Sequence, residues 1–217
     1  MRLLPPSLTH ILLVLALLPS WAHAADLEPA AATSSLVRQL SSMRSMEAAF
    51  HQWVLDGKQT VLQEVKGTMK IQRPGMFRWD SVDPYPQQIS TDSTTLWVYD
   101  KDLDQVTRKS LDRQVGNTPA LLLSGDPGAL AASFAISGHH FDNSDEIRYD
   151  LVPRDKDAMF ELLRVHFKAG KLSEMYLRDN LGHTTRIAFT VSSLNQPISP
   201  DVFRFVPPEG TDVITDE

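Results

Sequence analysis

The 217-residue sequence contains no cysteine, which excludes disulfide bonds, thiolate metal sites and cysteine nucleophiles. It also lacks an excess of basic residues, because 21 lysines and arginines face 27 aspartates and glutamates, for a net charge of −6. A protein-wide basic face for nucleic acid is therefore not expected. No apolar run reaches the roughly 20 residues that a membrane-spanning helix needs. The remaining composition, 42% hydrophobic and 22% charged, is typical of a globular protein.

The first 24 residues have the pattern of a secretory signal peptide. Arg2 supplies a positive charge, residues 11–18 are all apolar, and Ala22-His23-Ala24 matches the small-x-small pattern of a cleavage site. We therefore expect residues 1–24 to be removed on export and residues 25–217 to form a single soluble domain. The alternative is that the segment is retained as an N-terminal anchor.

Most of the remaining chain shows the two-residue periodicity of β-strands. Val65, Met69 and Ile71 share one face of a strand, and Lys66 and Lys70 occupy the other face. Strands that follow one another so closely favour antiparallel hairpins over parallel crossovers. The same alternation, bounded by turn residues, predicts further strands around residues 77–80, 96–99, 103–106, 147–151, 163–167, 187–191 and 203–205.

Two segments have helical patterns instead. A serine at position 34 or 35 can cap a short helix whose apolar residues include Leu40. The run from Thr118 to Leu123 begins with a capping residue and a proline suited to the first helical position. The sequence therefore predicts a mainly β (α+β) domain, in which two or three short helices pack against one strongly curved or barrel-like antiparallel sheet.

No constellation of catalytic or metal-binding residues is recognisable in the sequence. His139 and His140 precede Asp142, but neighbouring residues of a strand point to opposite faces and cannot chelate one ion. The sequence has no GxSxG, SxxK or P-loop motif. Its paired carboxylates lie in polar, turn-like stretches, where they are more often solvated than catalytic. We therefore expect neither an enzyme nor a cofactor or metal site.

Arg73 is the most informative single residue. It continues the strand face formed by Val65, Met69 and Ile71, and Pro74 then ends the strand. One interpretation is an arginine at a strand end that reaches out to water. The other is a guanidinium at the rim of an apolar chamber, where its five donors can bond the free carbonyls of a helix end. Such an arginine would be a latch that a ligand could displace.

Three aromatic residues lie within a span of 21 residues on the predicted strands: Phe77, Trp79 and Trp97. Packing in a core is the default interpretation of such residues. A curved sheet can instead enclose a ligand cavity rather than fill it.

Six motifs, taken together and in order, resemble a known family. They are GTMKIQRPGMFRWD at 67–80, TLWVYDKDLDQV at 95–106, Phe50-His51-Gln52, GNTP at 116–119, DNLG at 179–182 and FRFVPPEGTDV at 203–213. They extend over nearly all of residues 25–217 and resemble the periplasmic outer-membrane lipoprotein carrier (LolA) family.

The resemblance implies an unclosed antiparallel half-barrel with a lid of short α-helices over its concave, apolar face. It implies a periplasmic chaperone that performs no covalent chemistry. Such a chaperone binds the acyl chains of triacylated lipoproteins released by an inner-membrane ABC transporter. It then delivers them to an acceptor lipoprotein of the outer membrane. A monomer is expected from this shuttle role.

The resemblance also assigns roles to individual residues. Arg73 matches the arginine that holds the lid closed through helix carbonyls, and Phe77 matches an aromatic position implicated in docking to the transporter. The lid would contain Leu40 and the three leucines Leu121, Leu122 and Leu123. The residues expected to line the acyl-chain cavity or the docking surface are Val65, Met69, Ile71, Phe77, Trp79 and Trp97.

One departure from the family pattern concerns a turn. The family commonly has Asp-Gly before the Leu-Trp strand, whereas this chain has Asp92-Ser93. Serine tolerates the positive φ of a type I′ turn poorly, so this hairpin is expected to differ in geometry.

Two functions of other classes remain as alternatives. A periplasmic half-barrel domain could sense lipids or proteins without carrying them, and a filled core would favour that function. An exported hydrolase would require a cleft of converging carboxylates or histidines. The membrane-bound acceptor itself would need a lipidated N-terminal cysteine, which this chain lacks.

Overall fold

The computed structural model describes residues 26–110 and 123–216. The expected signal peptide, Leu121 and Leu122 lie outside these residues. The strands are β1 (Asp26–Leu27), β2 (Ser45–Leu55), β3 (Val61–Gln72), β4 (Met76–Asp83), β5 (Gln87–Asp92), β6 (Thr95–Asp100), β7 (Gln105–Ser110), β8 (Phe134–His140), β9 (Glu146–Pro153), β10 (Phe160–Lys168), β11 (Lys171–Asp179), β12 (Thr184–Leu194) and β13 (Asp212–Asp216).

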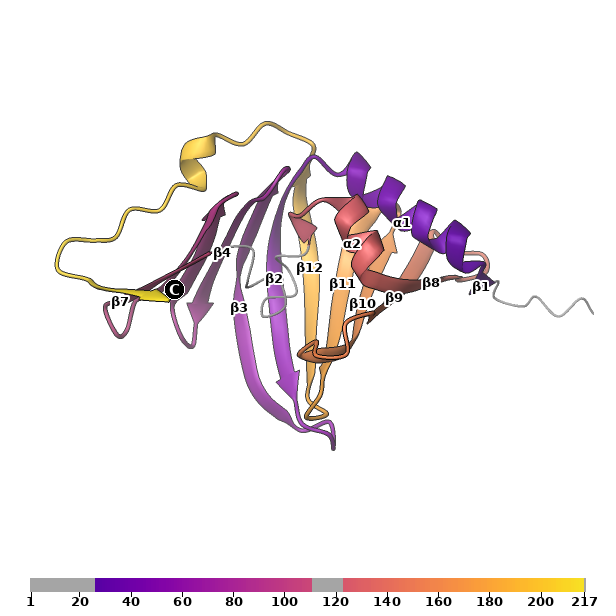
Figure 1. Cartoon of the computed structure of the whole chain (residues 1–217), viewed down its shortest axis with the longest axis horizontal. Coiled ribbons are helices and arrows are strands. Elements are labelled where there is room, and N and C mark those ends of the chain that lie inside the picture. The colour runs from indigo at the N-terminus through magenta and orange to yellow at the C-terminus, as the bar shows by residue number, and fades with distance from the viewer. Residues whose placement is uncertain (1–25, 111–122, 217) are drawn as a thin grey trace, which may run out of the picture.

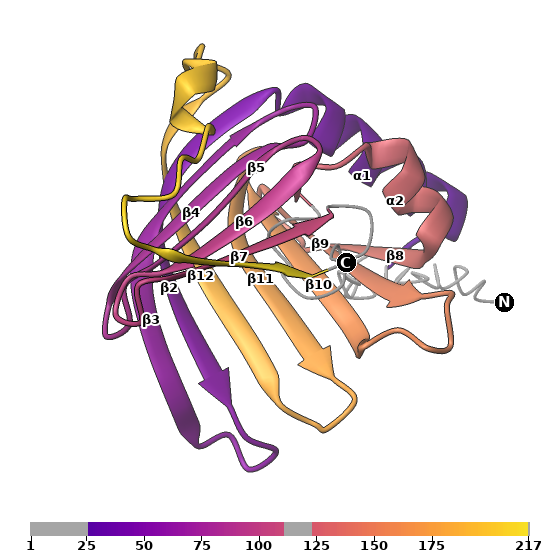
Figure 2. The same ribbon diagram turned by 60° about the vertical axis from the view of Figure 1, so that its left-hand side comes forward.

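These strands form one 13-stranded sheet in the order β1-β8-β9-β10-β11-β12-β2-β3-β4-β5-β6-β7-β13. Every neighbouring pair within the described residues is antiparallel except β13, which runs parallel to β7. The sheet curves strongly and does not close, since β1 and β13 remain its two edges (Figures 1 and 2). The predicted fold, an unclosed and mainly antiparallel sheet with short helices, is confirmed.

Two α-helices, α1 (Pro29–Ser42) and α2 (Pro127–Ser133), contact each other and β8 (Figure 1). The prediction that a serine at 34 or 35 caps the first helix is wrong, because α1 begins at Pro29, whose fixed φ suits the first helical position. α2 is capped by Asp126, whose carboxylate accepts a hydrogen bond from the Ala129 amide at 2.9 Å.

The helices lie over the β8 end of the concave face and complete its hydrophobic core (Figure 1). α1 buries Ala32, Leu36 and Leu40, and α2 buries Leu130. These residues belong to one apolar cluster with the inward-facing residues of the strands. The cluster receives side chains from β2, β3, β4, β6 and β8 to β12, so the lid helices share a core with most of the sheet.

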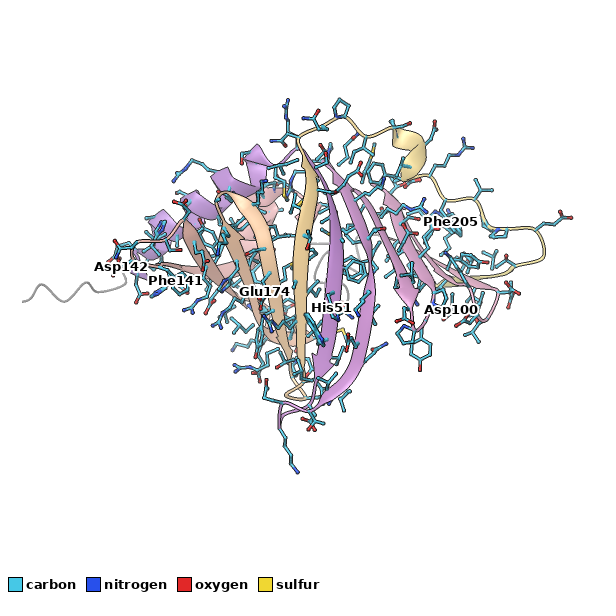
Figure 3. The ribbon with its side chains drawn as sticks, turned by 180° about the vertical axis from the view of Figure 1, so that it is seen from behind. His51, Asp100, Phe141, Asp142, Glu174 and Phe205 are labelled. Atoms are coloured by element: carbon cyan, nitrogen blue, oxygen red, sulfur yellow. The ribbon has the colours of Figure 1, made fainter. Side chains whose placement is uncertain are left out.

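The convex face carries a second, smaller apolar layer. The chain after β12, residues 195–211, forms a C-terminal strap that crosses the outside of the sheet before β13 pairs with β7 (Figure 3 labels Phe205 on it). The predicted strand at 203–205 is wrong: these residues follow a 3-10 turn, η3 (Pro200–Val202), and have no strand partner. Phe203 is nevertheless 1% exposed.

Gly67 lets two strands of the concave face pack under an aromatic pair. The ring of Phe50, directly across β2 and β3, lies over Gly67 and stacks on Trp79 with ring centroids 3.5 Å apart. A Cβ at Gly67 would lie 2.6 Å from the Phe50 ring and 2.0 Å from the Asp80 carbonyl oxygen. No side chain fits there without moving the stack or the backbone of β4.

We expect Gly67→Ala to lower the free energy of unfolding by about 1–3 kcal/mol, the usual cost of overpacking a core. Urea unfolding followed by tryptophan fluorescence measures this change. Gly57→Ala is the matched control, since its nearest contact would be an ordinary 3.9 Å, and it should leave stability almost unchanged. Equal stabilities of the two variants would contradict this account of the aromatic stack.

Candidate functional site

Arg73 lies in the turn between β3 and β4 and contacts the ends of both lid helices. Its Nε donates a hydrogen bond to the carbonyl oxygen of Met43, the residue that ends α1, at 3.1 Å. Its Nη1 donates to the carbonyl oxygen of Gly125, directly before the cap of α2. One guanidinium therefore joins the C-terminal end of α1 to the segment that leads into α2.

The environment of Arg73 is only partly favourable to a charge. Burial lowers the pKa of Arg73 to about 10, and the nearby carboxylate of Asp126 acts in the opposite direction. No group within the described residues accepts a hydrogen bond from its buried Nη2. Removing solvent from a donor without supplying an acceptor costs free energy. The closed position of Arg73 is thus held by two carbonyls against a desolvation cost.

Backbone hydrogen bonds fix the turn that carries this side chain. The Arg73 amide donates to the carbonyl of Arg44 at 2.8 Å, which ties the turn to the start of β2. The Gly75 amide donates to the carbonyl of Ser124 at 2.9 Å, which ties it to the segment before α2. The guanidinium consequently projects from a rigid base at the point where sheet and lid meet.

Ser93 supports the same turn from the neighbouring hairpin. Its hydroxyl donates to the Pro74 carbonyl at 3.1 Å, and its Cβ packs against Gly75. Ser93 adopts φ +86, so the positive φ expected in this turn, which serine tolerates poorly, falls on Ser93 itself. The Asp92 carboxylate accepts hydrogen bonds from the amides of Thr94 and Thr95 and holds the hairpin in this form.

Most of the residues predicted to line the cavity lie together on the concave face. Leu40 of α1 and Leu123, which precedes α2, are each 2% exposed, and both belong to the shared apolar cluster. Five residues of β3 and β4 belong to the same cluster: Val65, Met69, Ile71, Phe77 and Trp79. Phe77 is fully buried, so it forms part of the inner surface in this closed form and presents no outer docking surface.

Trp97 does not lie with them. It is paired with Ser90 and Arg108 on neighbouring strands, and its ring packs 5.6 Å from that of Phe205 on the C-terminal strap. The prediction that Trp97 lines the concave cavity is therefore wrong. Leu96 and Trp97 point to opposite faces of β6, Leu96 to the concave core and Trp97 to the strap. Both faces are covered, so only the position of the strap shows which residue lines the concave face.

Sequence reasoning missed the residues that fasten α1 to the sheet. The Ser35 hydroxyl lies 2.8 Å from the hydroxyl of Tyr149, and Gln39 Nε2 donates to the Gly170 carbonyl at 2.7 Å. At the other end, Asn195 Nδ2 donates to the Ser42 carbonyl at 3.0 Å. These contacts span 114 to 153 residues of sequence and leave no local pattern that could reveal them.

Beside α1 the surface has a separate hollow of about 410 Å³, lined mainly by polar groups that include Ser35, Gln39 and Asp145.

Among the residues described, no three histidines, aspartates and glutamates come together as a metal site. His139 instead contacts Asp26, with Nδ1 and Oδ1 2.7 Å apart. No helix in the described part of the chain has the length and apolar content needed to cross a membrane.

An apolar concave face under two helices, whose neighbouring ends one arginine joins, can be compared with known proteins. A sequence model of the family described as "Outer membrane lipoprotein carrier protein LolA" matches residues 41–206. The chain belongs to this LolA family. The resemblance inferred from the sequence motifs is confirmed.

Named relatives agree with this membership. The outer-membrane lipoprotein carrier protein of Alcanivorax borkumensis is 43% identical over 183 residues, which cover 84% of this chain and 87% of the relative. The protein of the same name from Pseudomonas aeruginosa PAO1 is 38% identical over 206 residues, 95% of this chain and 97% of its own length. Among solved structures, a DUF1329 family protein from Desulfovibrio piger superposes with a TM-score of 0.50 at 12% identity. The superposition covers 82% of this chain and 98% of the Desulfovibrio piger chain. At this identity it shows only that the two folds are alike.

The support that Ser93 gives to the Arg73 turn can be tested by two substitutions. We expect Ser93→Ala to lower the free energy of unfolding by about 1 kcal/mol, because the bond to Pro74 is lost and the positive φ remains. Ser93→Gly loses the same bond but also relieves a left-handed residue, worth about 1–2 kcal/mol, so it should be at least as stable as the natural protein. Urea unfolding measures both. An alanine variant as stable as the glycine variant would contradict this interpretation.

Proposed function

We propose that this protein is a periplasmic carrier that binds the acyl chains of lipoproteins and moves them between membranes. The observation that carries the proposal is the apolar concave face under α1 and α2, whose neighbouring ends a partly desolvated arginine joins. Membership of the LolA family, whose curated relatives bear the name lipoprotein carrier, supports it.

The physical need for such a carrier follows from the hydrophobic effect. Each methylene exposed to water costs about 0.8 kcal/mol, so acyl chains do not cross an aqueous compartment unescorted. A carrier has to bury the chains and still release them. In the closed form, Leu40 and Leu123 occupy the inner face with Phe77 and Trp79. Acyl chains that replace these contacts exchange one apolar partner for another, so the two states can lie within a few kcal/mol.

Arg73 is the latch of this equilibrium. It stabilises the closed form through the carbonyls of Met43 and Gly125, and loading breaks both bonds. α1 has further bonds to the sheet through Ser35, Gln39 and Asn195, whereas Arg73 is the side chain that also reaches the segment before α2. The Gly75 amide also holds that segment through the Ser124 carbonyl, so movement of the segment breaks this bond as well as the contact with Arg73.

The wider pathway follows from the same proposal. The cargo is a triacylated lipoprotein received from an inner-membrane ABC transporter and passed to an acceptor lipoprotein of the outer membrane. The protein acts as a monomer in the periplasm after removal of residues 1–24. It performs no catalysis and needs no cofactor, because transfer between partners requires only the exchange of apolar contacts.

Native mass spectrometry of the mature protein, co-expressed with a lipoprotein, tests carriage directly. We expect a soluble one-to-one complex with the acylated cargo. A cargo variant that cannot be acylated should form no complex, because the proposed binding energy comes from its acyl chains. If both cargo forms bind alike, or neither binds, the function of a periplasmic sensor domain is favoured instead.

Substitution of the latch tests the two-state scheme. Arg73→Leu removes both bonds that close the lid and adds apolar surface to the chamber. A hydrogen bond to a charged group is worth about 1.5–3 kcal/mol, so release of bound lipoprotein to a detergent or acceptor should slow by about tenfold or more. To measure the release rate, the transfer reaction is stopped at set times, and sedimentation separates the released lipoprotein from the lipoprotein still bound to the carrier.

Arg44→Leu is the control for that experiment. Arg44 is exposed beside the same turn, so its replacement makes a similar change of charge and size without removing the bonds to Met43 and Gly125. Release from this variant should match the natural protein. Unchanged release from Arg73→Leu would show that Arg73 is not the latch.

A further inference from the structure

The concave face is not uniformly apolar along its strands. Across β11, β12, β2 and β3, one row of paired residues consists of Met175, Ile187, Gln52 and Val65. The next row towards the hairpin ends consists of Leu177, Thr185, Val54 and Gln63. Directly paired residues share a face, so Gln52, Gln63 and Thr185 point to the same side as the core residues Met175, Ile187 and Val65.

Burial decreases between these two rows. Phe50, Val65 and Ile187 are at most 6% exposed, whereas Gln52 and Thr185 are only partly buried and Gln63 is exposed. The three polar residues thus stand where the closed core gives way to an accessible part of the inner surface. Gln52 is the diagonal neighbour of both Thr185 and Gln63, which lie in one row on either side of Val54.

The amides and the hydroxyl of this cluster have no partner in the part of the chain that the structure describes. Within the described residues, no hydrogen bond involves the side chains of Gln52, Gln63 or Thr185. All eight side chains of the two rows are uncharged. On the outer face of the same strands the pattern is different: His51 contacts Glu64, and Arg186 pairs with Glu174 (Figure 3 labels His51 and Glu174).

We propose that Gln52, Gln63 and Thr185 form a polar subsite for the ester and amide carbonyls through which acyl chains are joined to the cargo. This proposal rests on the function proposed above and names the part of the cargo that the three residues bind. The donors of these three side chains are uncharged, so the subsite accepts both neutral and zwitterionic cargo. They match carbonyl acceptors, which carry lone pairs and no charge.

The position of the subsite agrees with the shape of such a ligand. Acyl chains extend past the three polar residues into the core around Phe50, Val65 and Ile187, while their carbonyls remain at the polar side chains. Water solvates the three side chains when the chamber is empty. Carbonyls that replace this water exchange one hydrogen bond for another, so the subsite fixes the depth and orientation of the cargo more than it adds affinity.

Two synthetic lipopeptides separate this role from general apolar binding. One carries three palmitoyl chains, two as esters and one as an amide. The other carries chains of equal length with the two esters replaced by ethers, which are much weaker acceptors. Affinities of the full mature protein for both are measured by fluorescence titration, together with thermal stability.

We expect the natural protein to prefer the ester lipopeptide. In Gln52→Leu, the affinity for the ester lipopeptide should fall by about three- to tenfold, while the affinity for the ether analogue stays equal or rises, because the variant adds apolar surface. Thr185→Val should act in the same direction with a smaller change. A role in folding alone would lower both affinities together.

Gln196→Leu is the matched control, since Gln196 is exposed on the C-terminal strap, and both of its affinities should equal those of the natural protein. Equal effects of Gln52→Leu on the two lipopeptides, or no effect on either, would overturn the subsite while leaving the carrier function intact. Failure of the natural protein to bind either lipopeptide would overturn the carrier function, and the subsite with it.

Discussion

The contact of one guanidinium with two helix ends is the interaction on which the rest of this structure depends. Arg73 reaches Met43 and Gly125 only because the backbone of its turn is bonded to β2 and to the segment before α2. The cation is partly desolvated, and its Nη2 has no acceptor among the described residues, so its contacts with the lid are of limited strength. A carrier that must open again needs a fastening of limited strength.

The two faces of the sheet have different tasks, and their packing differs accordingly. The concave face holds the large apolar cluster together with α1 and α2, and its accessible end carries uncharged polar groups. The convex face is covered by the C-terminal strap over β4 to β6, where Phe205 contacts Trp97 and Tyr99 and Arg78 donates to the Val202 carbonyl. Elsewhere it carries ion pairs such as Arg164 with Asp150. The inner surface is thus left to the lid and its ligand.

A glycine within β3 and a serine in the turn between β5 and β6 show how local conformation serves the same site. Gly67 makes room for the stack of Phe50 on Trp79, which shapes the inner wall. Ser93 adopts a left-handed conformation, and its hydroxyl donates to the Pro74 carbonyl beside Arg73. In each case an unfavourable local feature, a missing side chain or a positive φ, is offset by a contact made with another strand.

The sequence by itself determined several of the strands, such as β3, β4, β9 and β10, and the face to which Val65, Met69 and Ile71 belong, because a period of two residues is a local property of the chain. The ordered motifs also determined the family. Only the tertiary structure decided that Trp97 faces the strap, that α1 begins at Pro29, and that Asn195 fastens its far end. Periodicity separates two faces of a strand, but what covers each face comes from segments more than a hundred residues away, whose contacts no local pattern records.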